Sequence, residues 1–140
     1  WVNGEKEGNG SMTWTSGDFM GDCYTGGFHK DERSGQGTLQ FSDGDKYVGQ
    51  WKFGDRHGFG TQTYEHDADS LEKSYTGQWS GDDWYGTGTI HYKSGEIFEG
   101  TFCNGEIHGE GKFTTTGGYS YIGYWDLGRR IRRDRISLQH

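Results

Sequence analysis

The chain has 140 residues, of which 29% are hydrophobic and 16% aromatic, with 27 Gly and no Pro. So few aliphatic residues cannot fill a two-layer core of ordinary packing, and the many rings argue against disorder. Residues 1–128 carry nine Lys and Arg against twenty Asp and Glu, a net charge of −11, so nucleic acid is not expected as a partner.

One pattern recurs along the chain. An aromatic residue is followed by Gly two positions on and by Trp or Phe two further, and after a turn comes Gly-x-Gly with another ring or aliphatic residue. A partial copy comes first, and further copies start near positions 19, 47, 75 and 98, with a truncated copy at 121. The starts at 19, 47 and 75 lie 28 residues apart and the later ones 23, so we expect extra residues in loops at 28–33 and 65–73.

The copy that starts at Tyr47 predicts a β-hairpin. Alternation places Tyr47, Gly49 and Trp51 on one face of a strand, and Gly58, Gly60, Gln62 and Tyr64 share one face of the returning strand. The residues between them point to the other face. Gly54 falls in the turn, where a left-handed backbone favours Gly. Glycines that alternate with rings allow the rings of one hairpin to lie over the glycines of the next.

These features predict an all-β fold, an elongated, twisted single antiparallel sheet of consecutive hairpins over residues 1–128, followed by a basic C-terminal tail, 129–140. The repeat resembles that of the MORN (membrane occupation and recognition nexus) family, Tyr-x-Gly-x-Trp-x-x-Gly-x-x-x-Gly-x-Gly. Three departures stand out: Cys23 replaces a Trp, Asp82 replaces a Gly, and Ile131-Arg132 replaces a His-Gly-like pair, which indicates that the array ends there.

An aromatic face without a covering layer is an apolar groove, and large rings are common anchors of protein interfaces. We therefore expect a scaffold that binds another protein, through a helix or extended segment of basic character, in this groove. Open strand edges also allow a dimer. The predicted groove residues are Tyr47, Trp51, Tyr75, Trp79, Phe98, Phe102, Tyr121 and Trp125.

No constellation of residues predicts catalysis, a metal or a cofactor, so the chain is not expected to be an enzyme. His57 and His108 occupy equivalent positions, which we interpret as turn positions, and four strands of ~4.8 Å would separate them, far beyond the reach of one zinc ion. Cys23 and Cys103 would lie ~29 Å apart, too far for a disulfide. The acidic residues of the second insertion lack the pattern of a calcium loop and are interpreted as a solvated loop. They are Glu65, Asp67, Asp69 and Glu72.

The tail suggests an alternative function. Clusters of four to eight basic residues can hold anionic lipid at about 1 kcal/mol per charge. The arginines concerned are Arg129, Arg130, Arg132, Arg133 and Arg135. The resemblance also implies a third possibility, a regulatory module of a larger enzyme or exchange factor. Two cysteines without a disulfide framework predict a cytoplasmic location, with the cytoskeleton or a membrane as the associated structure.

Overall fold

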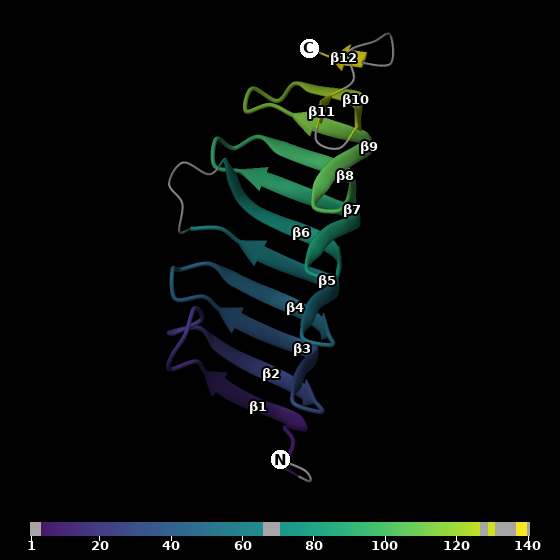
Figure 1. Cartoon of the computed structure of the whole chain (residues 1–140). Coiled ribbons are helices and arrows are strands. Elements are labelled where there is room, and N and C mark those ends of the chain that lie inside the picture. The colour runs from purple at the N-terminus through teal and green to yellow at the C-terminus, as the bar shows by residue number, and fades with distance from the viewer. Residues whose placement is uncertain (1–3, 66–70, 127–128, 131–136, 140) are drawn as a thin grey trace.

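The computed structural model describes residues 4–65, 71–126, 129–130 and 137–139. These residues contain no helix and form one antiparallel sheet, whose strands follow one another in chain order from β1 to β11, with β12 paired to β10 (Figure 1). This confirms the predicted single all-β sheet. The strands are β1 Gly8–Thr13, β2 Cys23–His29, β3 Glu32–Gln40, β4 Lys46–Lys52, β5 Asp55–Thr63, β6 Glu72–Ser80, β7 Asp83–Tyr92, β8 Ile97–Cys103, β9 Glu106–Thr114, β10 Ser120–Asp126, β11 Arg129–Arg130 and β12 Ser137–Gln139.

Two-residue turns close the hairpins. In the four turns described, which join β2 to β3, β4 to β5, β6 to β7 and β8 to β9, both central residues have positive φ, between 48° and 81°. This is the backbone of a type I′ turn, whose twist matches that of the flanking strands. Gly54 lies in such a turn, as predicted, at φ 80°. Asp31 and Asp82 hold the same position in their turns at φ 69° and 73°, a conformation that Asp tolerates better than most residues.

The predicted start of the second copy, near position 19, is wrong. Its first strand is β2, in which Tyr24, Gly26 and Phe28 occupy the places of Tyr47, Gly49 and Trp51, and Gly26 pairs with Gly37 as Gly49 pairs with Gly60. Residues 28–33 are therefore the end of β2, a turn and the start of β3, rather than an inserted loop. Phe19 belongs to the connection before β2 and is exposed. The shorter spacing of 23 residues thus applies here too.

A line of glycines runs across the sheet at right angles to the strands. Gly49 pairs with Gly37 on one side and with Gly60 on the other, and the line continues through β10. The first ring of a hairpin, such as Tyr47, lies over the glycines of its own hairpin, so the prediction that the rings cover the next hairpin is wrong for these rings. A Cβ placed on Gly60 would lie 2.1 Å from Tyr47 Oη. The tryptophan instead reaches the preceding hairpin, where Trp51 Nε1 donates to Gly37 O (3.2 Å).

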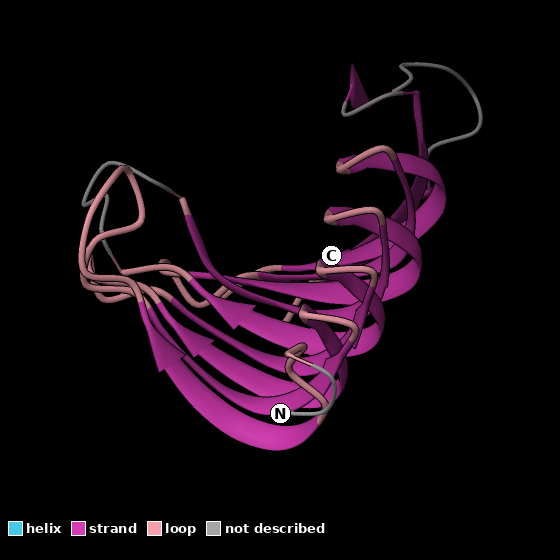
Figure 2. Ribbon diagram, turned by 60° about the horizontal axis from the view of Figure 1, so that its bottom comes forward, coloured by secondary structure: helices cyan, strands magenta, loops and turns pink. Residues whose placement is uncertain are grey.

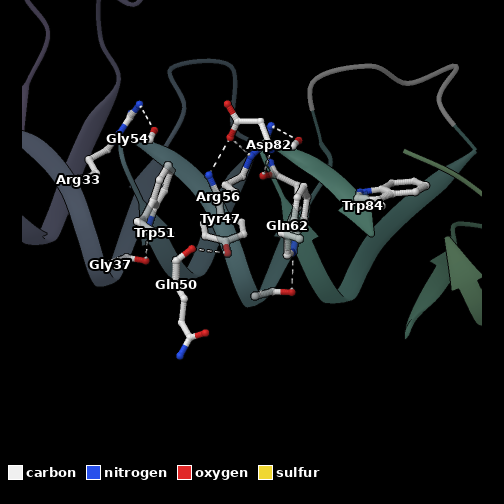
Figure 3. Close-up of polar contacts among 12 residues, drawn as sticks. Arg33, Gly37, Tyr47, Gln50, Trp51, Gly54, Arg56, Gln62, Asp82 and Trp84 are labelled. Atoms are coloured by element: carbon white, nitrogen blue, oxygen red, sulfur yellow. Dashed lines mark hydrogen bonds and ion pairs between the residues drawn. The ribbon is translucent and has the colours of Figure 1, made fainter. Parts of the chain in front are cut away.

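The strands curve strongly, so the sheet forms a trough with a concave and a convex face (Figure 2). Figure 3 shows Tyr47 and Trp51 on the concave side of the ribbon, and the other buried rings pack with them in one core cluster. Val48 and Phe59 point to the convex face and are exposed, as the alternation predicts. Because the sheet has no helical layer over either face in the described residues, any binding surface belongs to one of these two faces or to an edge.

Candidate functional site

Seven of the eight predicted groove residues, all but Tyr121, form the floor of the concave face together with Tyr24 and Phe28. Nine rings contact one another in an unbroken series, each pair edge-to-face with centroids 5.0–5.7 Å apart and interplanar angles of 78–89°. Such contacts stabilise aromatic pairs beyond the area they bury. In order across the sheet, this aromatic floor consists of Phe28, Tyr24, Trp51, Tyr47, Trp79, Tyr75, Phe102, Phe98 and Trp125.

The floor is too deeply buried to be the main contact surface. All nine rings are at most 7% exposed, and of the eight predicted groove residues only Tyr121 is half-buried. These rings lie together, but they form a packed core rather than an open groove. The rings fill the spaces above the glycine line, so a partner on this face would rest mostly on other side chains.

The polar groups of the floor are satisfied internally. Tyr24 Oη donates to Gly27 O, Tyr47 Oη to Gln50 O and Tyr75 Oη to Gln78 O, at 2.8–2.9 Å. Burial raises the pKa of all three phenols, that of Tyr24 to about 12. These tyrosines are therefore neutral hydrogen-bond donors near pH 7 and are not poised for acid–base chemistry.

A second layer of side chains, which the sequence analysis missed, lies above the floor on the side of the hairpin turns. Arg33 lies over the Trp51 ring at 4.7 Å and Arg56 over the Trp79 ring at 4.7 Å, while Trp84 stacks on Tyr75 at 4.7 Å. The members of this turn-side row all stand two residues before the first Gly of Gly-x-Gly. They are Lys6, Arg33, Arg56, Trp84 and Ile107. That fixed offset is a signal the sequence contained.

A matching row rises from the other side of the trough. We call Trp14, Phe41, Tyr64 and Tyr92 the loop-side row; all four are half-buried and pack against the core. The two rows meet over the floor. Trp84 Nε1 donates to Tyr64 Oη (3.1 Å), and the Arg33 guanidinium lies 5.6 Å from the Trp14 ring. These half-buried side chains are what the concave face exposes to solvent.

Aspartates in the turns hold two of the three cations of the turn-side row. Asp82 Oδ1 accepts from the backbone N of Arg56 (2.8 Å) and from its Nε (3.0 Å), as Figure 3 shows. Burial alone would raise the pKa of Asp82, but these hydrogen bonds and the charge of Arg56 outweigh it and lower the pKa. In the same way, Asp31 Oδ1 accepts from the backbone N of Lys6 (2.8 Å) and from Lys6 Nζ (3.4 Å).

A hollow of about 330 Å³ lies between the two rows near the N-terminal end of the described sheet. Arg33 and Arg56 contribute cations and Asp22 and Asp82 contribute carboxylates to its lining. The remaining lining is apolar and comes from Trp14, Phe19, Leu39, Phe41 and Trp51. Its lining combines rings with a few polar groups, a composition that ligand pockets share.

The other predicted features have mixed outcomes. His57 and His108 lie in β5 and β9, within strands rather than turns, and no three His, Cys, Asp or Glu residues of the described chain are grouped as a metal site would need. Cys23 in β2 and Cys103 in β8 are free. In the acidic insertion, Asp67 and Asp69 lie outside the described residues.

The basic tail is described only in part. Arg132, Arg133 and Arg135 lie outside the described residues, whereas Arg129 and Arg130 form β11, whose backbone pairs with Asp126 and Trp125 of β10. Among the described residues, no helix is long and apolar enough to cross a membrane.

Comparison with known families agrees with the repeat geometry. A family model described as MORN repeat matches residues 1–19, 24–46, 47–65 and 98–118, which is more than half of the chain. The chain belongs to the MORN repeat family. The matched segments 24–46 and 47–65 each begin at the tyrosine of a MORN hairpin, in the phase that the structure shows. MORN repeats serve generally as interaction modules for proteins or membranes, and as a family they are not catalytic.

The curated relatives are much longer proteins. Alsin from Homo sapiens and from Mus musculus is 31% identical over 112 residues, 76% of this chain and 7% of alsin. Alsin from Rattus norvegicus is 31% identical over 140 residues, 93% of this chain and 6% of alsin. The MORN array thus spans less than a tenth of the length of these relatives.

Proposed function

We propose that this MORN array is a docking module whose concave face binds a helix or an extended segment of another protein. The observation that carries the proposal is the pair of half-buried rows above the aromatic floor. Rings that are packed on one side and open on the other provide contact area at little entropic cost, because the floor already fixes their positions.

The charge of the array favours a partner of basic character. Residues 1–128 carry a net charge of −11, which speeds encounter with a basic segment and slows encounter with an acidic one. The expected location is the cytoplasm, with the cytoskeleton or a membrane as the associated structure, and this stays a prediction.

A peptide selection tests the proposal. A random-peptide display library is selected on the purified chain, and selected peptides are then measured on two matched variants. Phe41→Ala removes a ring of the loop-side row, and Phe59→Ala removes an exposed ring of the convex face. Affinity should fall at least roughly tenfold with Phe41→Ala, the equivalent of ~1.4 kcal/mol, and stay unchanged with Phe59→Ala.

Thermal unfolding of both variants checks that each is folded at the temperature of the binding measurement. Peptides that lose affinity for Phe59→Ala and keep it for Phe41→Ala would move the site to the convex face and overturn the proposal. Failure to select any peptide would do the same.

The tail supports a second candidate function, binding to anionic membrane surfaces. Residues 129–140 carry five arginines against one acidic residue, a net charge of +4. Flotation with liposomes that contain phosphoinositide, at physiological salt, with and without residues 129–140, tests it. Flotation that depends on the tail supports the membrane function, and a chain that stays in the soluble fraction either way excludes it for this segment.

The long relatives favour a third reading at the level of the whole protein. Because the array matches less than a tenth of alsin, segments of this kind occur within far longer chains, and the array can act there as a regulatory module. Full-length sequencing of the parent transcript would show whether other domains flank the array.

A further inference from the structure

The three cations of the turn-side row occupy equivalent places but differ in their partners. Each of Lys6, Arg33 and Arg56 stands directly beside the hairpin turn of the following copy. In every case, the last residue of that turn donates its N–H to the carbonyl of the cation's own residue: Asp31 N to Lys6 O, Gly54 N to Arg33 O and Asp82 N to Arg56 O, each at 3.1 Å. The backbone arrangement is therefore the same three times.

The side chain of the turn residue, however, is not the same in the three places. Asp31 and Asp82 supply a carboxylate that accepts from Lys6 and Arg56. The turn residue beside Arg33 is Gly54, which has no side chain to offer. Among the described residues Arg33 forms no ion pair, and its guanidinium makes one hydrogen bond, from Nη2 to Gly54 O (2.8 Å), which Figure 3 shows. Since a guanidinium has five N–H donors, most of its capacity is open.

Arg33 is also held in place and partly desolvated. Its guanidinium lies 4.7 Å from the Trp51 ring and 5.6 Å from the Trp14 ring, and it lines the hollow of about 330 Å³. Burial lowers the pKa of Arg33, partly offset by the charge of Asp82, so bringing a negative charge to this group would be favourable. A fixed, planar, partly desolvated fork is suited to a carboxylate.

We propose that Arg33 is the anchor for a single carboxylate, from an Asp or Glu side chain of the segment that docks on the concave face. This deepens the docking function above and rests on it. The basic character of the segment governs encounter, while one acidic side chain enters the hollow and takes the place that Asp31 and Asp82 fill in the neighbouring copies. A phosphate fits less well, because its second negative charge would face Asp22 and Asp82 in the same hollow.

The test uses a fragment in place of the unidentified partner. N-acetyl-glutamate methylamide is titrated into the ¹⁵N-labelled chain, and N-acetyl-glutamine methylamide is the neutral isostere. The glutamate fragment should shift the Arg33 Nε–H and Trp51 Nε1–H signals with saturation. The glutamine fragment should shift them at least roughly tenfold more weakly, the factor that one lost charge-assisted hydrogen bond implies.

Gly54→Asp is the decisive variant. Gly54 has a φ of 80°, and Asp31 and Asp82 occupy the same left-handed conformation at 69° and 73°, which Asp tolerates better than most residues. A Cβ at Gly54 would have its nearest neighbour, Glu32 Oε2, at 3.5 Å, so there is space for the side chain. The new carboxylate should pair with Arg33 and abolish binding of the glutamate fragment. Gly105→Asp adds the same charge to an equivalent turn at φ 81°, beside Trp84 rather than a cation, and should leave binding unchanged.

Three results would overturn the proposal: equal shifts from both fragments, full binding by Gly54→Asp, or inorganic phosphate binding Arg33 more tightly than the glutamate fragment. The carboxylate site and the docking function can be tested independently of each other. If the glutamate fragment binds but no peptide is selected, the carboxylate site is supported and the docking function is excluded. If selected peptides bind Gly54→Asp and the wild type with the same affinity, the docking function is supported and the carboxylate site is excluded.

Discussion

Replacing Gly60 with Ala should unfold the array at markedly lower denaturant, because the ring of Tyr47 occupies the space above that glycine. The added Cβ would lie 2.1 Å from Oη and 2.4 Å from Cζ of Tyr47. The ring cannot move aside freely, since it is packed edge-to-face against Trp51 and Trp79 at 5.0 and 5.3 Å and donates to Gln50 O.

The magnitude follows from these contacts. Forcing extra volume into a packed core costs about 1–3 kcal/mol, and losing the Tyr47 hydrogen bond costs about 1 kcal/mol more. Ala has a smaller backbone entropy than Gly in the unfolded chain, which offsets this destabilisation by about 0.5–1 kcal/mol. We expect the free energy of unfolding, measured by urea titration with tryptophan fluorescence, to fall by about 1–3.5 kcal/mol.

Gly10 provides the matched control. It holds the same place in the first, partial copy, but a Cβ there would meet only the Phe28 ring, at 3.7 Å, an ordinary contact. Gly10→Ala should therefore leave stability unchanged or raise it by about 0.5 kcal/mol. A loss below about 1 kcal/mol for Gly60→Ala, or an equal loss for Gly10→Ala, would refute the account of the glycine line as space for the rings.

Three further predictions concern the polar groups of the concave face. Tyr75→Phe removes the donor to Gln78 O and should lower the free energy of unfolding by about 1 kcal/mol, whereas Tyr85→Phe, at an exposed ring, should change it little in the same urea titration. The pKa of Asp82 is lowered in the folded chain, so the stability that its ionised form contributes is present above the unfolded pKa of ~4. This contribution disappears as the pH falls through the folded pKa. In a plot of melting temperature against pH, Asp82→Asn should therefore weaken the decline at acid pH. Because Asp82 is half exposed, the effect should not exceed about 1 kcal/mol, and an unchanged decline at acid pH would contradict the role given to its contact with Arg56. Burial raises the pKa of Tyr24, Tyr64 and Tyr92 to about 12, so the stability that their neutral forms contribute is complete below the unfolded pKa of ~10 and is lost as the pH rises through about 12. Tyrosine absorbance and far-ultraviolet circular dichroism should therefore change together over this pH range. Ionisation of these rings without unfolding would contradict the prediction.

The fold class, the hairpin as repeating unit and the residues of each face could all be predicted from the amino-acid pattern. These depend on short-range rules: side chains alternate along a strand, and Gly54 marks a turn with a left-handed backbone. The same rules failed at the second copy, where Phe28 stands in for Trp and Asp31 for Gly. Without a Trp and a turn Gly at these positions, the pattern predicts a start near position 19, although Tyr24 has the correct spacing of 23 residues to Tyr47.

The exposure of the side chains on the concave face, in contrast, could not be predicted from local patterns. The burial of Tyr47 and the other rings depends on the curvature of the whole sheet, which brings the turn-side and loop-side rows together over the floor. Trp84 and Tyr64 belong to different copies and to opposite sides of the trough, so no local pattern predicts their hydrogen bond. The open guanidinium of Arg33 likewise follows from its position beside Gly54, 21 residues away, because strand register sets which turn meets which cation.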